Sequence, residues 1–277
     1  IAILNLGLSY QAIENYEKSN DNFQRLDNQS DTIIFLMGTN YFHQKDFHSS
    51  LQKLQQISYS QEIPTSYSYN IAMCYFMLNE NNKALKYFNK SDSIGHLEED
   101  LYLTIASCHI NTEAYVEAIT PLDLHIQNHP NDFHAYWLRG YCYYQEYEWE
   151  LALKDFSLLS TWNTKPDNFY YIVGETQFEL DKLNEAIISY SQILENFPKD
   201  STSLAYTTIA YAMQLDVTTS INQFNLYANE HPDYEMKLGF EINRSLSDSS
   251  RQTYWNQACS YNDSNAVYTF FSLSLIH

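Results

Sequence analysis

Thiols and imidazoles are the most reactive side chains in this sequence, and their spacing limits the chemistry they can do. Cys74, Cys108 and Cys142 are equally spaced, since 108 − 74 = 34 and 142 − 108 = 34. Equal spacing predicts one shared register on helices that pack about 8 to 10 Å apart, which is beyond the Cα separation of a disulfide. We therefore expect three packing residues. Unpaired thiols are typical of a reducing compartment such as the cytoplasm.

The other candidates for chemistry lack the partners that catalysis or metal binding needs. His125 and His129 stand four residues apart, a spacing that holds zinc only when further ligands converge, and no such ligands are evident. The carboxylates of residues 98–100 precede a predicted helix, where the helix dipole favours negative charge. Motifs such as G-x-S-x-G, H-E-x-x-H and G-x-x-x-x-G-K-[ST] do not occur. The sequence therefore predicts no enzyme activity, no cofactor and no metal site.

The interval of 34 residues extends beyond the cysteines, apart from a first step of 31, and predicts the elements of the fold. If one recurring small residue is counted as position 8, a second small residue follows at position 20 and a large apolar residue at position 24. The position 8 residues are Gly7, Gly38, Ala72, Ala106, Gly140, Gly174 and Thr208. The position 20 residues are Ser19, Ser50, Ala84, Ala118, Ala152, Ala186 and Ser220. The position 24 residues are Phe23, Leu54, Phe88, Leu122, Phe156, Tyr190 and Phe224.

Each repeat is predicted to be a pair of helices, A and B, that cross at the two small residues. A bulky side chain at either position would push the backbones apart, and the position 24 residue fills the gap one turn further along helix B. Pro130, Pro198 and Pro232 end helix B because proline cannot continue the helical hydrogen bonds. Pro121 lies inside a predicted helix B, so we expect a kink there. Each hairpin exposes an apolar face until a neighbour covers it, so the hairpins must stack.

These registers resemble the tetratricopeptide repeat family, whose pattern has a small residue at position 8, Tyr at 11, Ala at 20, an aromatic at 24 and Pro at 32. The resemblance implies an all-α, right-handed α-solenoid of about seven repeats over residues 1–232, with capping helices over residues 233–277. We expect the first repeat to be truncated, because the chain starts at Ile1 inside the pattern. In the capping segment we expect helices over residues 234–246, 251–260 and 266–275.

The composition agrees with a helical protein and excludes some partners. Only 6 Gly and 6 Pro among 277 residues leave too few turns for an all-β fold. Lys and Arg number 15 against 34 Asp and Glu, a net charge of 15 − 34 = −19, which argues against nucleic acid as a ligand. No apolar run approaches the ~18 residues of a membrane-spanning helix. The 25 Tyr suit half-buried positions and binding surfaces.

The resemblance also implies where a partner would bind. In the family, helix A lines a concave groove, and positions 2, 5, 9, 12 and 13 point into it. Aromatic rings, which are enriched among the residues that dominate interface energies, occupy or adjoin several of these positions. The predicted partner-binding residues are Phe42, Phe76, Trp137, Tyr141, Tyr144, Tyr171, Phe178 and Tyr206. The alternative that some of these rings only pack between neighbouring helices stays open at this point.

The predicted function is a non-catalytic scaffold or adaptor that binds a peptide or helix of a partner protein. The groove positions carry no Lys or Arg in the seven repeats, which argues against the basic clamp that some family members use for acidic peptide termini. We therefore expect a neutral or basic peptide, and the scaffold could be a subunit of a larger complex. Two alternatives remain open. One is the repeat segment of a longer chain with a catalytic or membrane-anchored part upstream, and the other is a regulator switched by a peptide.

Overall fold

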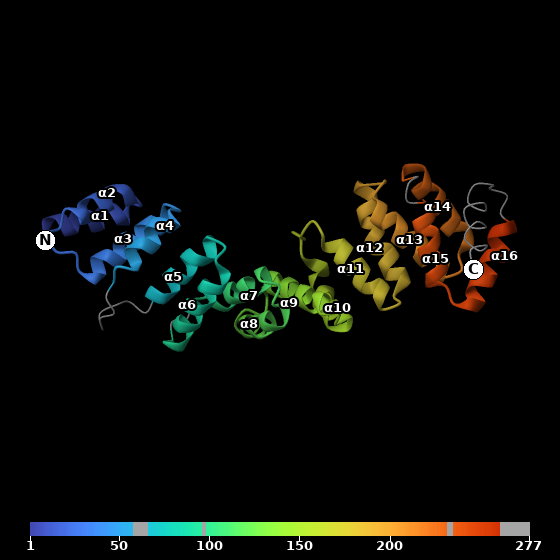
Figure 1. Cartoon of the computed structure of the whole chain (residues 1–277), viewed down its shortest axis with the longest axis horizontal. Coiled ribbons are helices and arrows are strands. Elements are labelled where there is room, and N and C mark those ends of the chain that lie inside the picture. The colour runs from blue at the N-terminus through green and yellow to red at the C-terminus, as the bar shows by residue number, and fades with distance from the viewer. Residues whose placement is uncertain (58–65, 96–97, 232–234, 261–277) are drawn as a thin grey trace. The chain divides into compact units, whose positions relative to one another are not determined.

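The computed structural model describes residues 1–57, 66–95, 98–231 and 235–260, and every regular element within those ranges is helical. Figure 1 shows the helices following one another along the chain as hairpins. No helix in the described ranges is both long enough and apolar enough to cross a membrane. The chain forms two compact units, Ile1–Cys142 and Tyr143–His277, and the boundary falls inside one helix, α9.

Consecutive helices of each unit pair as the sequence predicts. The helices that lie before the boundary are α1 (Ala2–Ala12), α2 (Tyr16–Gln24), α3 (Asp31–His43), α4 (Phe47–Leu54), α5 (Ser66–Met77), α6 (Asn81–Ser93), α7 (Leu101–Asn111) and α8 (Tyr115–Asn128). Helix α9 spans Phe133–Gln145. The helices after it are α10 (Trp149–Leu158), the 3-10 helix η1 (Leu159–Thr161), α11 (Phe169–Glu179), α12 (Leu183–Asn196), α13 (Ser201–Met213), α14 (Val217–Glu230), α15 (Glu235–Ser245) and α16 (Asp248–Ser260). The all-α hairpin solenoid is confirmed.

Close contact with the side chain of the position 24 residue explains the glycines at position 8. A Cβ atom added to Gly38 would lie 2.6 Å from Leu54 Cδ2, and one added to Gly7 would lie 2.5 Å from Phe23 Cε1. In both repeats the clashing side chain is the position 24 residue of the same hairpin, and both of these side chains are fully buried. The prediction that a small residue and a large one share the crossing is confirmed.

In two of the three repeats with serine at position 20, a hydrogen bond across the hairpin accommodates the hydroxyl. Ser50 Oγ donates to the carbonyl oxygen of Gly38 at 2.8 Å, and Ser220 Oγ donates to that of Thr208 at 3.0 Å. Because a buried hydroxyl without a partner is costly, these bonds explain how serine replaces alanine there. They join position 20 of helix B to position 8 of helix A.

The turn between helices A and B has a feature that the sequence analysis did not find. The first residue after the A-helix cap takes a left-handed backbone conformation, with φ between 55° and 63°, in all seven repeats. These residues are Glu14, Lys45, Asn79, Glu113, Tyr147, Asp181 and Leu215, and none is glycine. The amide of Leu215 donates to Ala212 and that of Asp216 to Tyr211, the bond pair of a Schellman motif.

Helices α15 and α16 continue the 34-residue interval with the residue sizes reversed. Position 8 falls on Ile242 (208 + 34), position 20 on Tyr254 (220 + 34) and position 24 on Ala258 (224 + 34). All three are at most 2% exposed and share one hydrophobic cluster with residues of α13 and α14. Two predicted C-terminal helices are thus confirmed, with ends that differ from the prediction by at most three residues. The third, residues 266–275, lies outside the described residues. The boundary at residue 232 stays a prediction.

Helix α8 continues past the proline inside it. It runs from Tyr115 to Asn128 without interruption, although Pro121 cannot donate a backbone hydrogen bond. The carbonyl that loses this bond belongs to Glu117, an exposed residue. An exposed carbonyl can accept a hydrogen bond from solvent instead, and the helix is unbroken across Pro121. The kink itself stays a prediction.

Candidate functional site

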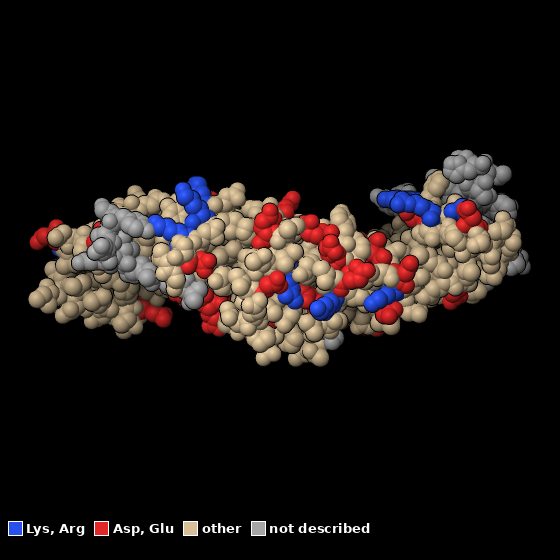
Figure 2. Space-filling model, turned by 90° about the horizontal axis from the view of Figure 1, so that it is seen from below, with Lys and Arg blue, Asp and Glu red and all other residues tan. Residues whose placement is uncertain are grey.

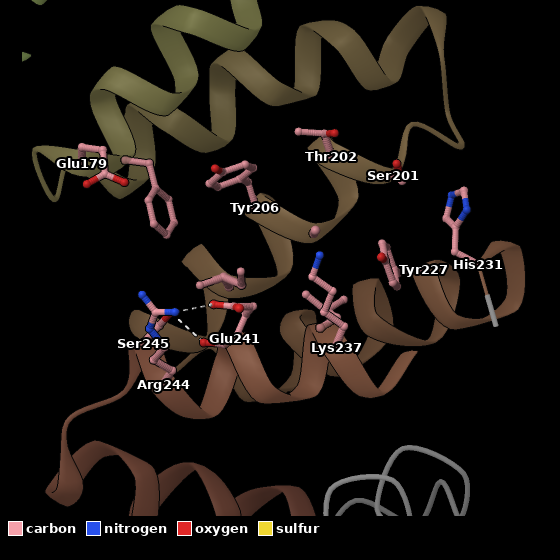
Figure 3. Close-up of a pocket in the computed structure, with 14 residues that line it drawn as sticks. Glu179, Ser201, Thr202, Tyr206, Tyr227, His231, Lys237, Glu241, Arg244 and Ser245 are labelled. Carbon is pink, nitrogen blue, oxygen red and sulfur yellow. Dashed lines mark hydrogen bonds and ion pairs between the residues drawn. The ribbon is translucent and has the colours of Figure 1, made fainter. Parts of the chain in front are cut away.

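A cavity of about 770 Å³ in the second unit is the best-formed candidate site. Its walls come from the A helices α11, α13 and α15 and from the end of α14. Figure 3 shows Glu179 and Tyr206 on one side of it and Lys237 and Glu241 on the α15 side. Three A helices thus contribute most of the lining of this cavity.

Two of the predicted partner-binding residues meet in this cavity. Phe178 of α11 and Tyr206 of α13 line it, with ring centroids 5.2 Å apart and an interplanar angle of 76°. Tyr206 also stacks on Tyr190 of α12, at 5.0 Å and 10°. Both cavity rings are half-buried, so they combine packing within the unit with a surface open to a ligand.

Carboxylates surround the Tyr206 hydroxyl. The pKa of Tyr206 is raised to about 12, first by burial and then by the negative charges of Glu175, Glu179 and Glu241. The opposing charges in the cavity wall come from α15, where Lys237 is exposed and Arg244 Nη1 lies 3.8 Å from Glu241 Oε2. On the face drawn in Figure 2, Asp and Glu (red) are widespread and Lys and Arg (blue) form separate small groups.

Two further predicted residues of this unit are held by carboxylates. The Tyr144 hydroxyl donates to Glu175 Oε2 at 2.6 Å, and the Tyr171 hydroxyl donates to Asp200 Oδ1 at 2.7 Å. Burial, followed by this bond to Asp200, raises the pKa of Tyr171 to about 12. Both rings are half-buried, so each has a structural role whether or not it also contacts a ligand.

The remaining four predicted residues lie in the first unit. Phe42, Phe76 and Tyr141 are half-buried, and Phe42 packs edge-on against Phe47 at 5.4 Å. Trp137 is only 7% exposed, and its ring centroid lies 6.2 Å from that of Tyr141. Trp137 therefore belongs mainly to the core, and truncating it would test stability before binding.

The charged residues that α15 contributes to the cavity wall were not predicted from the sequence. Lys237, Glu241 and Arg244 come from α15, which was expected only to cap the solenoid. The 34-residue interval could have predicted them, because position 8 of a further repeat would fall 34 residues after Thr208, on Ile242 in α15. Lys237 and Arg244 lie in α15, after the seven repeats whose groove positions carry no Lys or Arg.

The sulfur and imidazole groups have structural surroundings. Cys74, Cys108 and Cys142 are buried thiols outside any disulfide, and burial raises the pKa of Cys108 to about 12. His125 Nε2 lies 2.8 Å from Asp132 Oδ2, and Asp132 accepts a hydrogen bond from the first turn of α9. Over the part of the chain that the structure describes, His, Cys, Asp and Glu form no group of three suited to a metal ion.

Fold and cavity together define a class, namely helical-repeat solenoids that present a ligand-sized cavity on their A helices. The family model described as "Tetratricopeptide repeat" matches residues 67–91 and 169–200, which correspond to the hairpins α5–α6 and α11–α12. In these two hairpins the chain carries tetratricopeptide repeats. No curated protein matches it significantly.

Solved structures share this fold at low sequence identity. The C-terminal part of a TPR repeat-containing protein from Cytophaga hutchinsonii is 12% identical, with a TM-score of 0.57, covering 85% of this chain and 98% of that one. A tetratricopeptide repeat protein from Parabacteroides merdae is 13% identical, with a TM-score of 0.53, covering 88% and 100%. MamA from Desulfovibrio magneticus is 13% identical, with a TM-score of 0.54, covering 63% and 99%. These similarities concern the fold.

Proposed function

We propose that this protein is a non-catalytic interaction scaffold that binds a peptide or helix of a partner protein along its A helices. The observation that carries the proposal is the cavity between α11, α13 and α15, in which Phe178 and Tyr206 are both half-buried. Protein interaction is the general role of tetratricopeptide repeats. The groove mode and the residues that contact the partner are the specific parts of the proposal.

The aromatic pair supports binding for an energetic reason. Residues that dominate interfaces are rigid, partly desolvated side chains at the centre of a contact, with Trp, Tyr and Arg the most frequent. Tyr206 is already fixed by its stacking on Tyr190, and Phe178 by its contact with Tyr206. Little side-chain entropy is lost when a ligand packs on rings that are already ordered.

Charge favours a neutral or basic partner. The net charge of −19 repels acidic proteins and speeds encounter with basic ones. Glu175, Glu179 and Glu241 add a local negative potential around the Tyr206 hydroxyl. A scaffold of this charge is expected to bind more weakly as salt concentration rises.

The experiment tests whether a ligand occupies the cavity. Peptides are selected from a random library on the full chain, and their affinities are measured by isothermal titration calorimetry. Thr202, an exposed residue of the cavity wall, is replaced by Trp to fill the cavity mouth. We expect selected peptides to lose about tenfold or more in affinity for Thr202→Trp, because the added ring occupies their contact surface.

Thr218 provides a matched control. Thr202 and Thr218 are both exposed threonines at the second position of a helix, α13 and α14 respectively, and Thr218 does not line the cavity. Thr218→Trp should therefore leave affinity unchanged. Equal affinity for the two variants, or a selection that yields no peptide, would overturn the proposal.

A further inference from the structure

The cavity has an acidic, aromatic corner that favours one kind of side chain. We propose that Phe178, Tyr206, Glu179 and Glu241 bind an arginine side chain of the partner peptide. This inference rests on the proposed function, which it deepens by naming the group that is recognised. The cavity residues come from α11, α13 and α15, so one side chain would contact three consecutive A helices.

The chemistry of the corner matches a guanidinium group. A planar cation stacks on aromatic rings and donates two parallel hydrogen bonds to a carboxylate, which the compact ammonium group of lysine cannot do in the same way. The corner offers two rings and carboxylates from opposite walls, as Figure 3 shows for Glu179 and Glu241 around Tyr206. The lining of the cavity thus contains both kinds of partner for a guanidinium group.

An internal guanidinium already lies at the edge of this corner. Arg244 Nη1 is 3.8 Å from Glu241 Oε2, and its side chain is 83% exposed. The separation is long for a charge-assisted hydrogen bond, so Glu241 is held loosely by its neighbour. An arginine from a partner can replace this contact without breaking a tight ion pair.

A buried hydroxyl next to the corner lacks a partner. Tyr190 is 1% exposed, and no group among the described residues hydrogen bonds with its hydroxyl. Its pKa is raised, chiefly by burial and then by Tyr206, Glu175, Tyr144 and Glu179. Glu179 of the corner is therefore near enough to this hydroxyl to act on it electrostatically. Tyr190 itself does not line the cavity, so its hydroxyl is a neighbour of the corner and not one of the groups proposed to bind arginine.

The test uses the peptides that the full chain selects and that Thr202→Trp fails to bind. We expect these cavity-binding peptides to share an arginine. Replacing that arginine by citrulline, which keeps the shape and removes the charge, should weaken binding about tenfold or more, and replacement by lysine should weaken it by several fold. Calorimetry of the full chain measures each affinity.

Protein variants identify the carboxylates involved. In the double variant Glu179→Gln, Glu241→Gln, arginine and citrulline peptides should bind alike, because the charge partners are gone. Glu195→Gln, which removes the same type of charge from exposed α12 surface, should leave the preference for arginine intact. Thermal melts followed by circular dichroism establish that the variants are folded.

The outcomes separate this inference from the proposed function. Cavity-binding peptides that lack arginine, or that tolerate citrulline or lysine in its place, would overturn the arginine site and leave the scaffold proposal standing. A preference for arginine that survives in the double variant would also overturn it. If no selected peptide depends on the cavity, both proposals fail.

Discussion

Leu215 and Tyr147 hold a backbone conformation that their own side chains disfavour. Their φ values are 58° and 61°, in the left-handed region, which costs a residue with a Cβ roughly 1–2 kcal/mol. The Schellman hydrogen bonds that close the A helix impose this conformation. The chain thus accepts strain at a position where glycine would carry none.

Replacing Leu215 by glycine should stabilise the protein. We expect a gain of roughly 1 kcal/mol in the free energy of unfolding of the second unit, because the left-handed strain is removed and a side chain that is 37% exposed gives up limited burial. Urea unfolding followed by circular dichroism measures the change. Leu215→Ala is the control, since it retains the Cβ and should bring no gain. Equal stability of the Gly and Ala variants would contradict the strain argument.

The turn residues also show why single-residue features differ in predictability. The crossing positions could be predicted because residues of similar size recur there from repeat to repeat. Gly38 with Leu54 and Ala84 with Phe88 are examples of a small residue paired with a large one. The left-handed position was not visible, because Glu14, Lys45 and Leu215 share no chemistry. Only their common place after the A helix relates them, and that requires the backbone.

At the scale of elements, the crossing of α3 and α4 depends on one glycine. Gly38→Ala improves helix propensity, but its new Cβ would lie 2.6 Å from Leu54 Cδ2 and 2.7 Å from Cγ. Leu54 is fully buried and cannot move aside. We expect the clash to outweigh propensity and to lower the free energy of unfolding by about 1–3 kcal/mol, measured by urea unfolding.

A second substitution distinguishes the clash from other effects. Leu54→Ala alone leaves a cavity and should be strongly destabilising, by about 2–5 kcal/mol. In the double variant the two losses should not add, because removing the Leu54 side chain also removes the clash with residue 38. Additive losses would show that Gly38 is needed for a reason other than space.

The candidate site was only partly predictable at this scale. Phe178 and Tyr206 were found because they occupy or adjoin groove positions of regular repeats. The α15 residues Lys237 and Glu241 were not, because Ile242 stands where the pattern requires a small residue and so hides the eighth hairpin. Because large and small residues exchange places in α15 and α16, the hairpin still packs, but the repeat pattern can no longer be recognised in its sequence.

Over the whole molecule, acidity acts on stability in two opposite ways. The net charge of −19 creates repulsion at neutral pH, and protonation toward the isoelectric point near 4.6 relieves it. Hydrogen bonding lowers the pKa of Asp46, where the Ser49 bonds dominate, and of Asp132 and Asp200, where bonds outweigh the opposing effect of burial. Carboxylates with lowered folded-state pKa values stabilise the fold only while they are ionised.

These effects predict a maximum of stability at about pH 5. From pH 7 downward the fold should gain stability as repulsion falls. Below an unfolded-state value of 3.8 the three aspartates bind protons more readily in the unfolded chain, so their contribution is lost as pH falls through the folded pKa values. Melting temperatures from pH 3 to pH 7 measure this curve. Added salt should flatten its neutral limb, and a steady decline from pH 7 to pH 5 would contradict the repulsion argument.

The reversed sizes at Ile242, Tyr254 and Ala258 give the array a fixed order. Hairpins that share the small, small, large arrangement have similar contact surfaces and are interchangeable modules in principle. The α15–α16 hairpin has large residues where the others have small ones. The Tyr254 hydroxyl oxygen lies 3.1 Å from Ser220 Oγ of the preceding hairpin. We therefore expect an extra copy of an ordinary hairpin to be tolerated between earlier members of the series, whereas a copy inserted directly before α15 must reproduce Ser220, which contacts Tyr254.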